Sequence, residues 1–459
     1  MSETISQRLA DWVCSVRPGD LPPDVVDATL HSVIDVLGLC LAARKEPYTL
    51  AALQAWEGAG GSSVFGMKAT LDASGAALVN GTAAHGEDFD NTFEGCPVHS
   101  GAVIVPAVLA VAERDRLDGA TSLTAMAVGI ELMCRLGLVA KKGMHAAGFH
   151  PTAITGAMGA AGAVGKALRL SPEQLANGFG VAGSMASGII EYLADGSWTK
   201  RMHAGWAAQS GIRAALMGKS GFVGPRTVFE GSHGLFSAFA PSLEPDFSPL
   251  VEDLGQRWEA ARVAFKPYAC GTMTQPYVDC AVALRADGIR SVDIVEIVCD
   301  VGEGTVHRLW EPLALKQRPP NGYAAKFSTP YCMAVGLIDG DAGLRQFSPE
   351  RVGNPEILDL AAKVTYRIDP ANEYPANYSG HLRARLRNGT VVEKRQPTLR
   401  GGARQPMTRE ELVEKFRSNA AYGGWPAPAA EALLQAALDL GSLADANRIG
   451  EVMREGFPS

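Results

Sequence analysis

Residues 85–101, HGEDFDNTFEGCPVHSG, carry many titratable side chains for a segment of loop-like composition. Three interpretations fit this pattern: a divalent-cation loop built from carboxylate and carbonyl oxygens, a structural cap of the apolar helix expected at 102–113, and a site that moves protons near neutral pH. The titratable residues are two histidines and four acids: His85, Glu87, Asp88, Asp90, Glu94 and His99.

The rest of the sequence does not support a cation-binding loop. The motif lacks the ligand series and the glycine of an EF-hand loop. Asp-rich motifs that bind Mg²⁺ and a diphosphate need a second acidic cluster, and the other helical segments show no clear one. We therefore expect an acid/base site and predict neither a metal nor a cofactor.

A second candidate stretch is KKGMHAAGFHPTAITG, residues 141–156, which contains His145 and His150. Pro151 restricts His150 to an extended backbone, and Thr152 is predicted to cap the helix that follows. A histidine at such a helix start can face a bound anion, because the helix dipole favours negative charge there. The alternative is that both histidines only form hydrogen bonds within surface loops.

Two further stretches contain basic residues that could bind an anion. Lys200, Arg201 and His203 precede an almost uncharged helical segment, and two cations beside a buried surface can hold a carboxylate. Lys266 and Tyr268 lie near the expected domain boundary, where small-molecule sites are common. The first stretch could instead be an ordinary solvated helix start, and the second could have a purely structural role.

The bulk composition limits the class of protein. The chain has 459 residues, 47% of them hydrophobic and 20% charged, and a net charge of −7, which indicates a globular protein and argues against nucleic acid as the main partner. Eight scattered cysteines without a CxxC pair predict no disulfide framework or zinc ribbon. The N-terminal sequence has no signal-peptide design, so we expect a cytoplasmic location. Residues 153–170 are predicted to form a buried helix rather than a membrane span.

The elements expected along the chain predict a mainly α fold with two domains. Residues 1–265 and 399–459 carry helical patterns, such as 171–185 with Ser171 as N-cap, and are expected to form one helical domain. Residues 266–398 are expected to form an inserted α+β domain. They contain strand-like segments at 291–303 and 364–369, a helix at 329–340, and a hairpin at 381–395 around Asn388-Gly389.

Seven stretches of the chain, which follow one another in the same order as in the family, resemble the MmgE/PrpD family over nearly the whole sequence. The resemblance implies a helical domain from both chain ends, an inserted α+β lid, a homodimer, and metal-free chemistry on small di- or tricarboxylates. Members include 2-methylcitrate dehydratase, cis-aconitate decarboxylase and iminodisuccinate epimerase. The stretches lie at residues 80–92, 99–110, 149–161, 199–211, 265–279, 322–340 and 406–416.

The resemblance also implies roles for individual residues. The active-site Asp and Thr of the family fall on Asp88 and Thr92, its His before Pro on His150, and its Lys on Lys200. The positions expected to contact the substrate are Thr92, His145, Arg201, His203, Lys266, Tyr268 and Gln275.

This chain departs from the family pattern at two positions. Val98 stands where several members have a histidine, and His99 follows it. Gln275 replaces a histidine of many members and cannot titrate. Both departures bear on which reaction the chain catalyses.

The expected chemistry is removal of a proton from carbon next to a carboxylate. We assign His150 or Asp88 as the base and His99 as the acid, with Thr92 and Lys200 orienting the substrate. A hydro-lyase ranks first, because elimination needs one base and one acid, and an epimerase ranks second. The same residues would also suit a decarboxylase or a non-catalytic carboxylate-binding protein.

Overall fold

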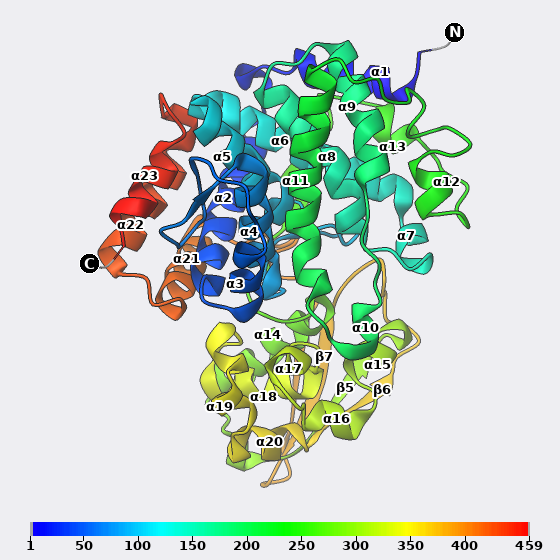
Figure 1. The fold of residues 1–459 in the computed structure, drawn as a ribbon. Helices are drawn as coiled ribbons and strands as arrows, with labels where there is room; N and C mark the ends of the chain where they lie inside the picture. Colours follow the sequence, from blue (N-terminus) through cyan, green and yellow to red (C-terminus); the bar gives the residue numbers. More distant parts are fainter. Residues whose placement is uncertain (1–2, 458–459) are drawn as a thin grey trace. The chain divides into compact units, whose positions relative to one another are not determined.

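The computed structural model describes residues 3–457, and these residues form two compact units (Figure 1). The larger unit comprises the chain up to Gly86, Asp90–Ala264, and the chain from Arg409 onward. The smaller unit comprises Phe265–Thr408 together with a three-residue segment, Glu87–Phe89. The chain therefore enters the smaller unit briefly, in the middle of the titratable motif.

The larger unit is built from helices and two short antiparallel strand pairs, β1 with β2 and β3 with β4. Its elements are α1 (Ile5–Ser15), α2 (Pro23–Ala43), α3 (Pro47–Gln54), β1 (Ser62–Ser63), β2 (Thr70–Leu71), α4 (Ala73–Gly86), β3 (Thr92–Phe93), α5 (Gly101–Asp115), α6 (Gly119–Ala140), α7 (Gly143–Ala146), α8 (Pro151–Ala167), α9 (Pro172–Met185), α10 (Tyr192–Asp195), α11 (Thr199–Lys219), α12 (Leu235–Phe239), α13 (Ser248–Val251), β4 (Val263–Ala264), α21 (Arg409–Tyr422), α22 (Ala427–Leu438) and α23 (Arg448–Glu455).

The smaller unit contains one four-stranded sheet and seven α-helices within the described residues. The strand order is β6-β5-β7-β8, with β5 parallel to β6 and the other pairs antiparallel. Its elements are α14 (Gln275–Ala286), β5 (Ile294–Val301), α15 (Glu303–Leu309), α16 (Leu313–Gln317), α17 (Gly322–Ala325), α18 (Thr329–Asp339), α19 (Pro349–Val352), α20 (Pro355–Ala361), β6 (Val364–Ile368), β7 (Gly380–Leu386) and β8 (Val391–Gln396). The prediction of a mainly α fold is confirmed.

Several local predictions are confirmed by their capping and turn geometry. Ser171 caps α9 in a capping box with Gln174. Gly389, with φ of +85°, turns β7 into β8, as the Asn-Gly signal predicts. Thr152 differs from its prediction: His150 takes the N-cap position of α8, and the Thr152 hydroxyl instead accepts a hydrogen bond from the backbone N–H of His99.

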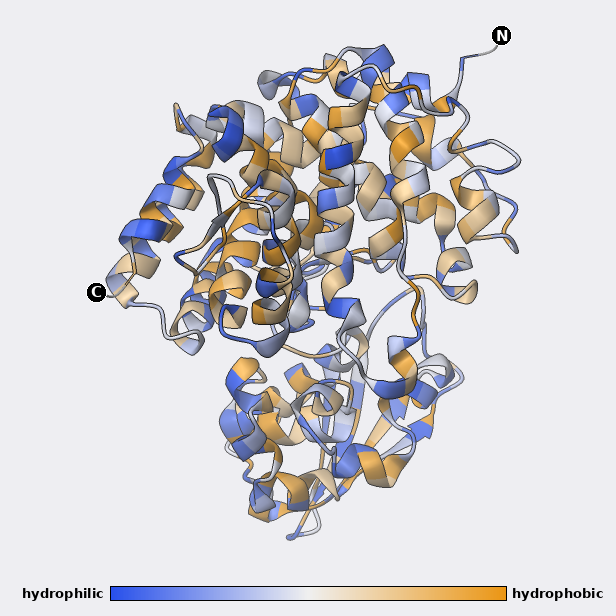
Figure 2. Cartoon of the chain, viewed as in Figure 1, coloured by the Kyte–Doolittle hydropathy of each residue, from blue (hydrophilic) through white to orange (hydrophobic). Residues whose placement is uncertain are grey.

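The inner helices of the larger unit are strongly apolar, and Figure 2 colours much of α2 and α4 orange. Two helices, α2 and α6, are long and apolar enough to cross a membrane by length and composition, but 72% and 94% of their most apolar windows is buried inside the protein. Burial of this extent is typical of core helices in a folded domain. The predicted buried helix over 153–170 is observed as α8, in which every residue from Pro151 to Gly165 is buried.

Candidate active site

Four histidines meet in the larger unit where one helix ends and three others begin. His85 lies in the last turn of α4, and His99 lies two residues before α5. His150 immediately precedes α8, and His203 lies in the second turn of α11. The four residues are only 1% to 6% exposed. We call this group the histidine cluster.

A glycine contact between α4 and α11 allows this meeting. A Cβ on Gly81 would lie 2.6 Å from the Cα of Gly205, and a Cβ on Gly205 would lie 2.0 Å from the carbonyl oxygen of Leu78. The two helices can approach this closely only because both positions are glycine. His85 follows Gly81 by one turn and His203 precedes Gly205 by two residues, so the contact brings both histidines to the same site.

The imidazole rings of the cluster contact one another. The Nδ1 atoms of His150 and His203 are 3.2 Å apart. The rings of His85 and His150 are stacked, with centroids 5.5 Å apart, and the rings of His85 and His99 are 4.9 Å apart. Tyr192, the first residue of α10, lies against His150 and His203 with ring centroids 6.3 and 5.9 Å away.

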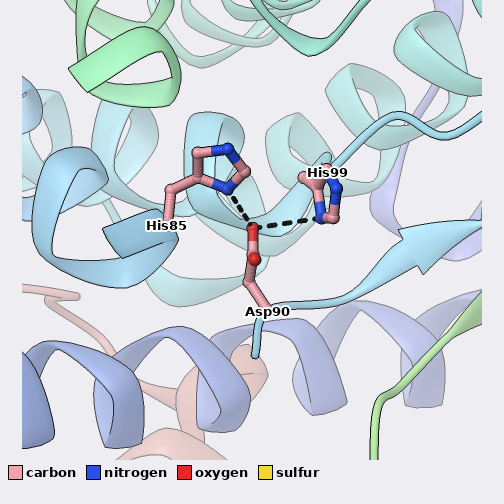
Figure 3. Close-up of side chains that lie close together, drawn as sticks. All are labelled: His85, Asp90 and His99. Carbon is pink, nitrogen blue, oxygen red and sulfur yellow. Dashed lines mark hydrogen bonds and ion pairs between the residues drawn. The ribbon is translucent and has the colours of Figure 1, made fainter. Parts of the chain in front are cut away.

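Asp90 bridges two members of the cluster (Figure 3). Its Oδ2 lies 2.8 Å from Nδ1 of His85 and 3.4 Å from Nδ1 of His99. Nδ1 of His99 is also 2.8 Å from the carbonyl oxygen of Asn91. That carbonyl can only accept, so His99 donates from Nδ1, and a neutral ring then has its lone pair on Nε2.

His85, Asp90 and His99 are also a possible cation site, because their potential ligand atoms lie within 4.8 Å of one another. The hydrogen-bond geometry argues against this use of Nδ1, since an Nδ1 that donates to a carbonyl has no lone pair left for a metal. Asp90 is instead placed to accept from His85 and to orient its ring. Nε2 of His85 is buried and has no hydrogen-bond partner among the described residues.

Burial favours the neutral form of His85 and His150. Burial would raise the pKa of Asp90, but His85 and His99 outweigh it and hold this pKa well below its usual value. Burial lowers the pKa of His85 although Asp90 acts in the opposite direction. Burial lowers the pKa of His150 well below its usual value, and the neighbouring histidines and Lys200 add to this effect. At neutral pH, His85 and His150 are therefore uncharged beside an ionised Asp90.

The pair formed by His150 and His203 presents a proton acceptor and an N–H donor at once. Burial lowers the pKa of His203 to about 4, so both rings are neutral at pH 7. A hydrogen bond between two neutral rings through Nδ1 requires one donor and one acceptor. The donor ring then presents a basic Nε2, and the acceptor ring presents an Nε2–H.

The smaller unit holds other predicted residues. Nζ of Lys266, which is 3% exposed, donates to the Asp88 carbonyl oxygen at 2.7 Å and lies 3.6 Å from Oδ1 of Asp88. Asp88 itself has φ of +55°. The Tyr268 hydroxyl donates to Asp279 at 2.8 Å, and burial raises the pKa of this tyrosine. The Gln275 amide donates to the carbonyl oxygens of Tyr268 and Cys270.

The remaining predicted residues lie in the larger unit. Thr92 is buried on β3, where it pairs with Ala264 of β4. Lys200 is partly buried in the first turn of α11, and its charge acts on the histidine cluster. The Arg201 guanidinium lies over the Tyr48 ring at 4.3 Å. His145 lies on α7 and is partly exposed.

The structure thus brings together His99, His150 and His203 near Lys200, and separately pairs Asp88 with Lys266. The sequence prediction leaves out His85 and Asp90, although both stand in the titratable motif. No local spacing rule pairs a histidine at a helix end with an acid five residues later, so their contact emerges only from the fold.

The cluster predicts a specific dependence of stability on pH. In the unfolded chain His203 has a pKa near 6.5, whereas in the folded protein it is about 4. The contribution of His203 to the free energy of unfolding is therefore fully present above pH 6.5. It is lost as pH falls toward 4, by about 3 kcal/mol for this residue. Urea unfolding at pH 7, 6 and 5 should show this slope, and His203→Gln should flatten it. The same slope in His203→Gln as in the wild type would contradict the assignment, and exposed His233→Gln is the matched control.

Two family models match this chain: the MmgE/PrpD N-terminal domain over residues 7–248 and the MmgE/PrpD C-terminal domain over residues 268–440. Similar proteins include cis-aconitate decarboxylase of Aspergillus terreus, 26% identical over 441 residues, covering 90% of this chain and 89% of that protein. Cis-aconitate decarboxylase of Homo sapiens is 28% identical over 92% of this chain and 88% of its own. That of Mus musculus is 29% identical over 75% of this chain and 71% of its own. The two models together span most of the sequence, and the chain belongs to the MmgE/PrpD family.

Proposed function

We propose that the protein is a lyase that acts on a small di- or tricarboxylate by proton transfer at a carbon next to a carboxylate. One observation carries this proposal: the buried histidine cluster, in which a basic Nε2 and an Nε2–H occur on neighbouring rings joined by a hydrogen bond that can pass a proton. Such a pair can take a proton from one atom and deliver one to another.

An anionic substrate fits the electrostatics of the cluster. Three helices, α5, α8 and α11, begin there; in none of them does the N-cap side chain accept from the first N–H groups, although the Gly101 N–H of α5 is taken by the Asn91 side chain. Helix N-termini attract carboxylates, and Lys200 adds a positive charge in the first turn of α11. Negative charge on a bound substrate would raise the pKa of nearby histidines, so binding would supply the proton that the chemistry needs.

Decarboxylation of a cis-aconitate-like substrate is the first reaction to test, because the relatives described above are named cis-aconitate decarboxylases. In this reaction the bond between carbon and the departing carboxylate breaks and CO₂ leaves. The electron pair spreads into the remaining unsaturated carboxylate, where Lys200 can stabilise the charge. A histidine of the cluster then gives its proton to the carbon.

Dehydration is the second candidate, and the paired tautomers of His150 and His203 favour it. The donor ring would remove the proton from carbon with its Nε2 and pass its Nδ1 proton to the other ring, whose Nε2–H would protonate the β-hydroxyl, which leaves as water. A homodimeric assembly, a cytoplasmic location and independence from metals and cofactors stay predictions.

The experiment that tests the function is a proton-NMR screen in D₂O, with and without EDTA. The substrates are cis-aconitate, methylcitrate, citrate and iminodisuccinate. Loss of carboxylate with one deuterium incorporated indicates a decarboxylase, formation of an alkene indicates a hydro-lyase, and deuterium exchange with inversion indicates an epimerase. Tight binding of a carboxylate with no exchange or turnover would overturn the proposal in favour of a binding protein.

Lys200→Met should weaken binding of a tricarboxylate by about 10- to 100-fold, since it removes a charged partner of a carboxylate. Lys200 also lowers the pKa of His150 and His203, so its removal raises both. The acid limb of the kcat/KM profile should therefore move to higher pH. Calorimetry and pH–rate profiles measure the two effects. Lys219→Met, exposed at the other end of α11, is the control, and an unmoved acid limb in Lys200→Met would contradict this role.

A further inference from the structure

A buried ion pair joins two helices that are far apart in the sequence. Nζ of Lys415 on α21 lies 2.7 Å from Oδ1 of Asp35 on α2, and the two side chains are 5% and 0% exposed. Removing two charges from water is costly, and buried ion pairs often stabilise a fold no better than apolar residues of the same size. A contribution to stability alone therefore does not explain why this ion pair is present.

Asp35 uses its second oxygen to hold the loop of the site. Oδ2 of Asp35 accepts from the backbone N–H of Asn91 at 3.0 Å. The Asn91 side chain is held as well, because its Nδ2 donates to Ser32 at 3.0 Å and its Oδ1 accepts from the N–H of Gly101 at 3.0 Å. With its backbone N–H and both side-chain polar atoms occupied, Asn91 is held at its Cα and side chain, which limits the directions its carbonyl oxygen can take.

That carbonyl oxygen determines the protonation pattern of His99. It accepts from Nδ1 of His99 at 2.8 Å. The backbone N–H of His99 is fixed separately by the hydroxyl of Thr152 at 3.1 Å. A neutral His99 ring is therefore the Nδ1–H tautomer, with its lone pair on Nε2.

We propose that Lys415 and Asp35 are positioning residues for His99: acting through Asn91, they hold the Nδ1–H tautomer, so that Nε2 exchanges the proton with the substrate. This inference rests on the proposed function, because it assigns His99 a part in proton transfer. It extends the site to the C-terminal helices, from which no member of the histidine cluster comes.

The charge of Lys415 is essential to this arrangement. Burial raises the pKa of Asp35, the charge of Asp90 raises it further, and Lys415 opposes both. Without Lys415 the pKa of Asp35 would rise further, and a protonated Asp35 is a poorer acceptor for the Asn91 N–H. Asn91 would then lose one of the three hydrogen bonds that hold it in place, and its carbonyl oxygen, which belongs to the next peptide unit, could turn away from His99.

Nitrogen NMR of protein labelled with ¹⁵N-histidine measures the tautomer without any substrate, and the spectrum of His99→Gln assigns the signal. We expect protonated Nδ1 on His99 in the wild type and a mixture of tautomers in Lys415→Met. We also expect kcat of Lys415→Met to fall on the order of 10- to 100-fold with KM little changed, and Lys415→Arg to restore most of it. Arg417→Met, on the same helix as Lys415, removes a cation from an exposed pair with Glu431 of α22 and should change neither quantity.

Lys415→Met leaves a buried carboxyl without its partner and can destabilise the protein. The double variant Asp35→Leu with Lys415→Met removes both charges together, and it should fold and still show mixed tautomers. The inference is overturned if the neutral His99 ring of the wild type carries its proton on Nε2. It is also overturned if Lys415→Met and the double variant both keep the His99 tautomer and the kcat of the wild type. A tautomer change in a protein that turns over none of the carboxylates supports the positioning role and overturns the proposed function.

Discussion

His150→Gln should lower kcat on the accepted carboxylate by about 10²- to 10⁴-fold, the usual contribution of a general acid or base. The glutamine amide can still form a hydrogen bond with His203, so the pocket keeps its shape while losing a ring that can transfer a proton. KM should change much less, because the positive charges that attract the substrate remain. Steady-state kinetics with the substrate found by the NMR screen measures both constants.

The control for this substitution is His233→Gln, which changes an exposed histidine of the same unit. It should keep the kcat of the wild type. If His150→Gln retained kcat within about threefold of the wild type, well short of a general acid or base contribution, proton transfer would have to be assigned to other members of the cluster.

Asp90→Asn should lower kcat by about 10²- to 10⁴-fold as well, for a different reason. Asp90 is the only charged partner that the hydrogen-bond geometry gives to His85 within the described residues, and it accepts from Nδ1 of that ring at 2.8 Å. An asparagine offers either an oxygen or an NH₂ group, so the tautomer of His85 is no longer fixed, and loss of the fixed tautomer in such dyads has effects of about this size. The negative charge that would stabilise a protonated ring also disappears.

Thermal unfolding and kinetics together test this prediction. Asp115→Asn, at the exposed C-terminal end of α5, removes one carboxylate from a surface pair and should leave kcat unchanged. A folded Asp90→Asn protein with the kcat of the wild type would show that the dyad is structural only.

The elements that the sequence predicts well are those fixed by neighbouring residues. Ser171 and Pro172 begin α9, and Asn388-Gly389 closes the β7–β8 hairpin, because the capping and turn preferences of these residues act over a few positions. The family follows from motifs spread over the whole chain, and the matches to both family models confirm it.

The site is less predictable, because long-range contacts decide it. The motif offers Asp88 and Asp90 two residues apart, and no local rule tells which of them meets a histidine. The structure gives Asp90 to His85 and Asp88 to Lys266, because the chain crosses into the smaller unit between Gly86 and Asp90. The glycine contact of α4 with α11, which brings His85 toward His203, involves segments far apart in the sequence and leaves no periodic pattern.

The segment Glu87–Phe89 has a consequence for how the chain folds as it is made. Lys266 and Lys326 donate to the carbonyl oxygens of Asp88 and Glu87, which precede them by 178 and 239 residues. On the ribosome, the segment must therefore wait without these partners until residue 326 has emerged. Conversely, a fragment that begins at Phe265 would enclose two ammonium groups lacking their acceptors. The smaller unit can thus complete its fold only after Glu87–Phe89, which were synthesised much earlier, have bound to it.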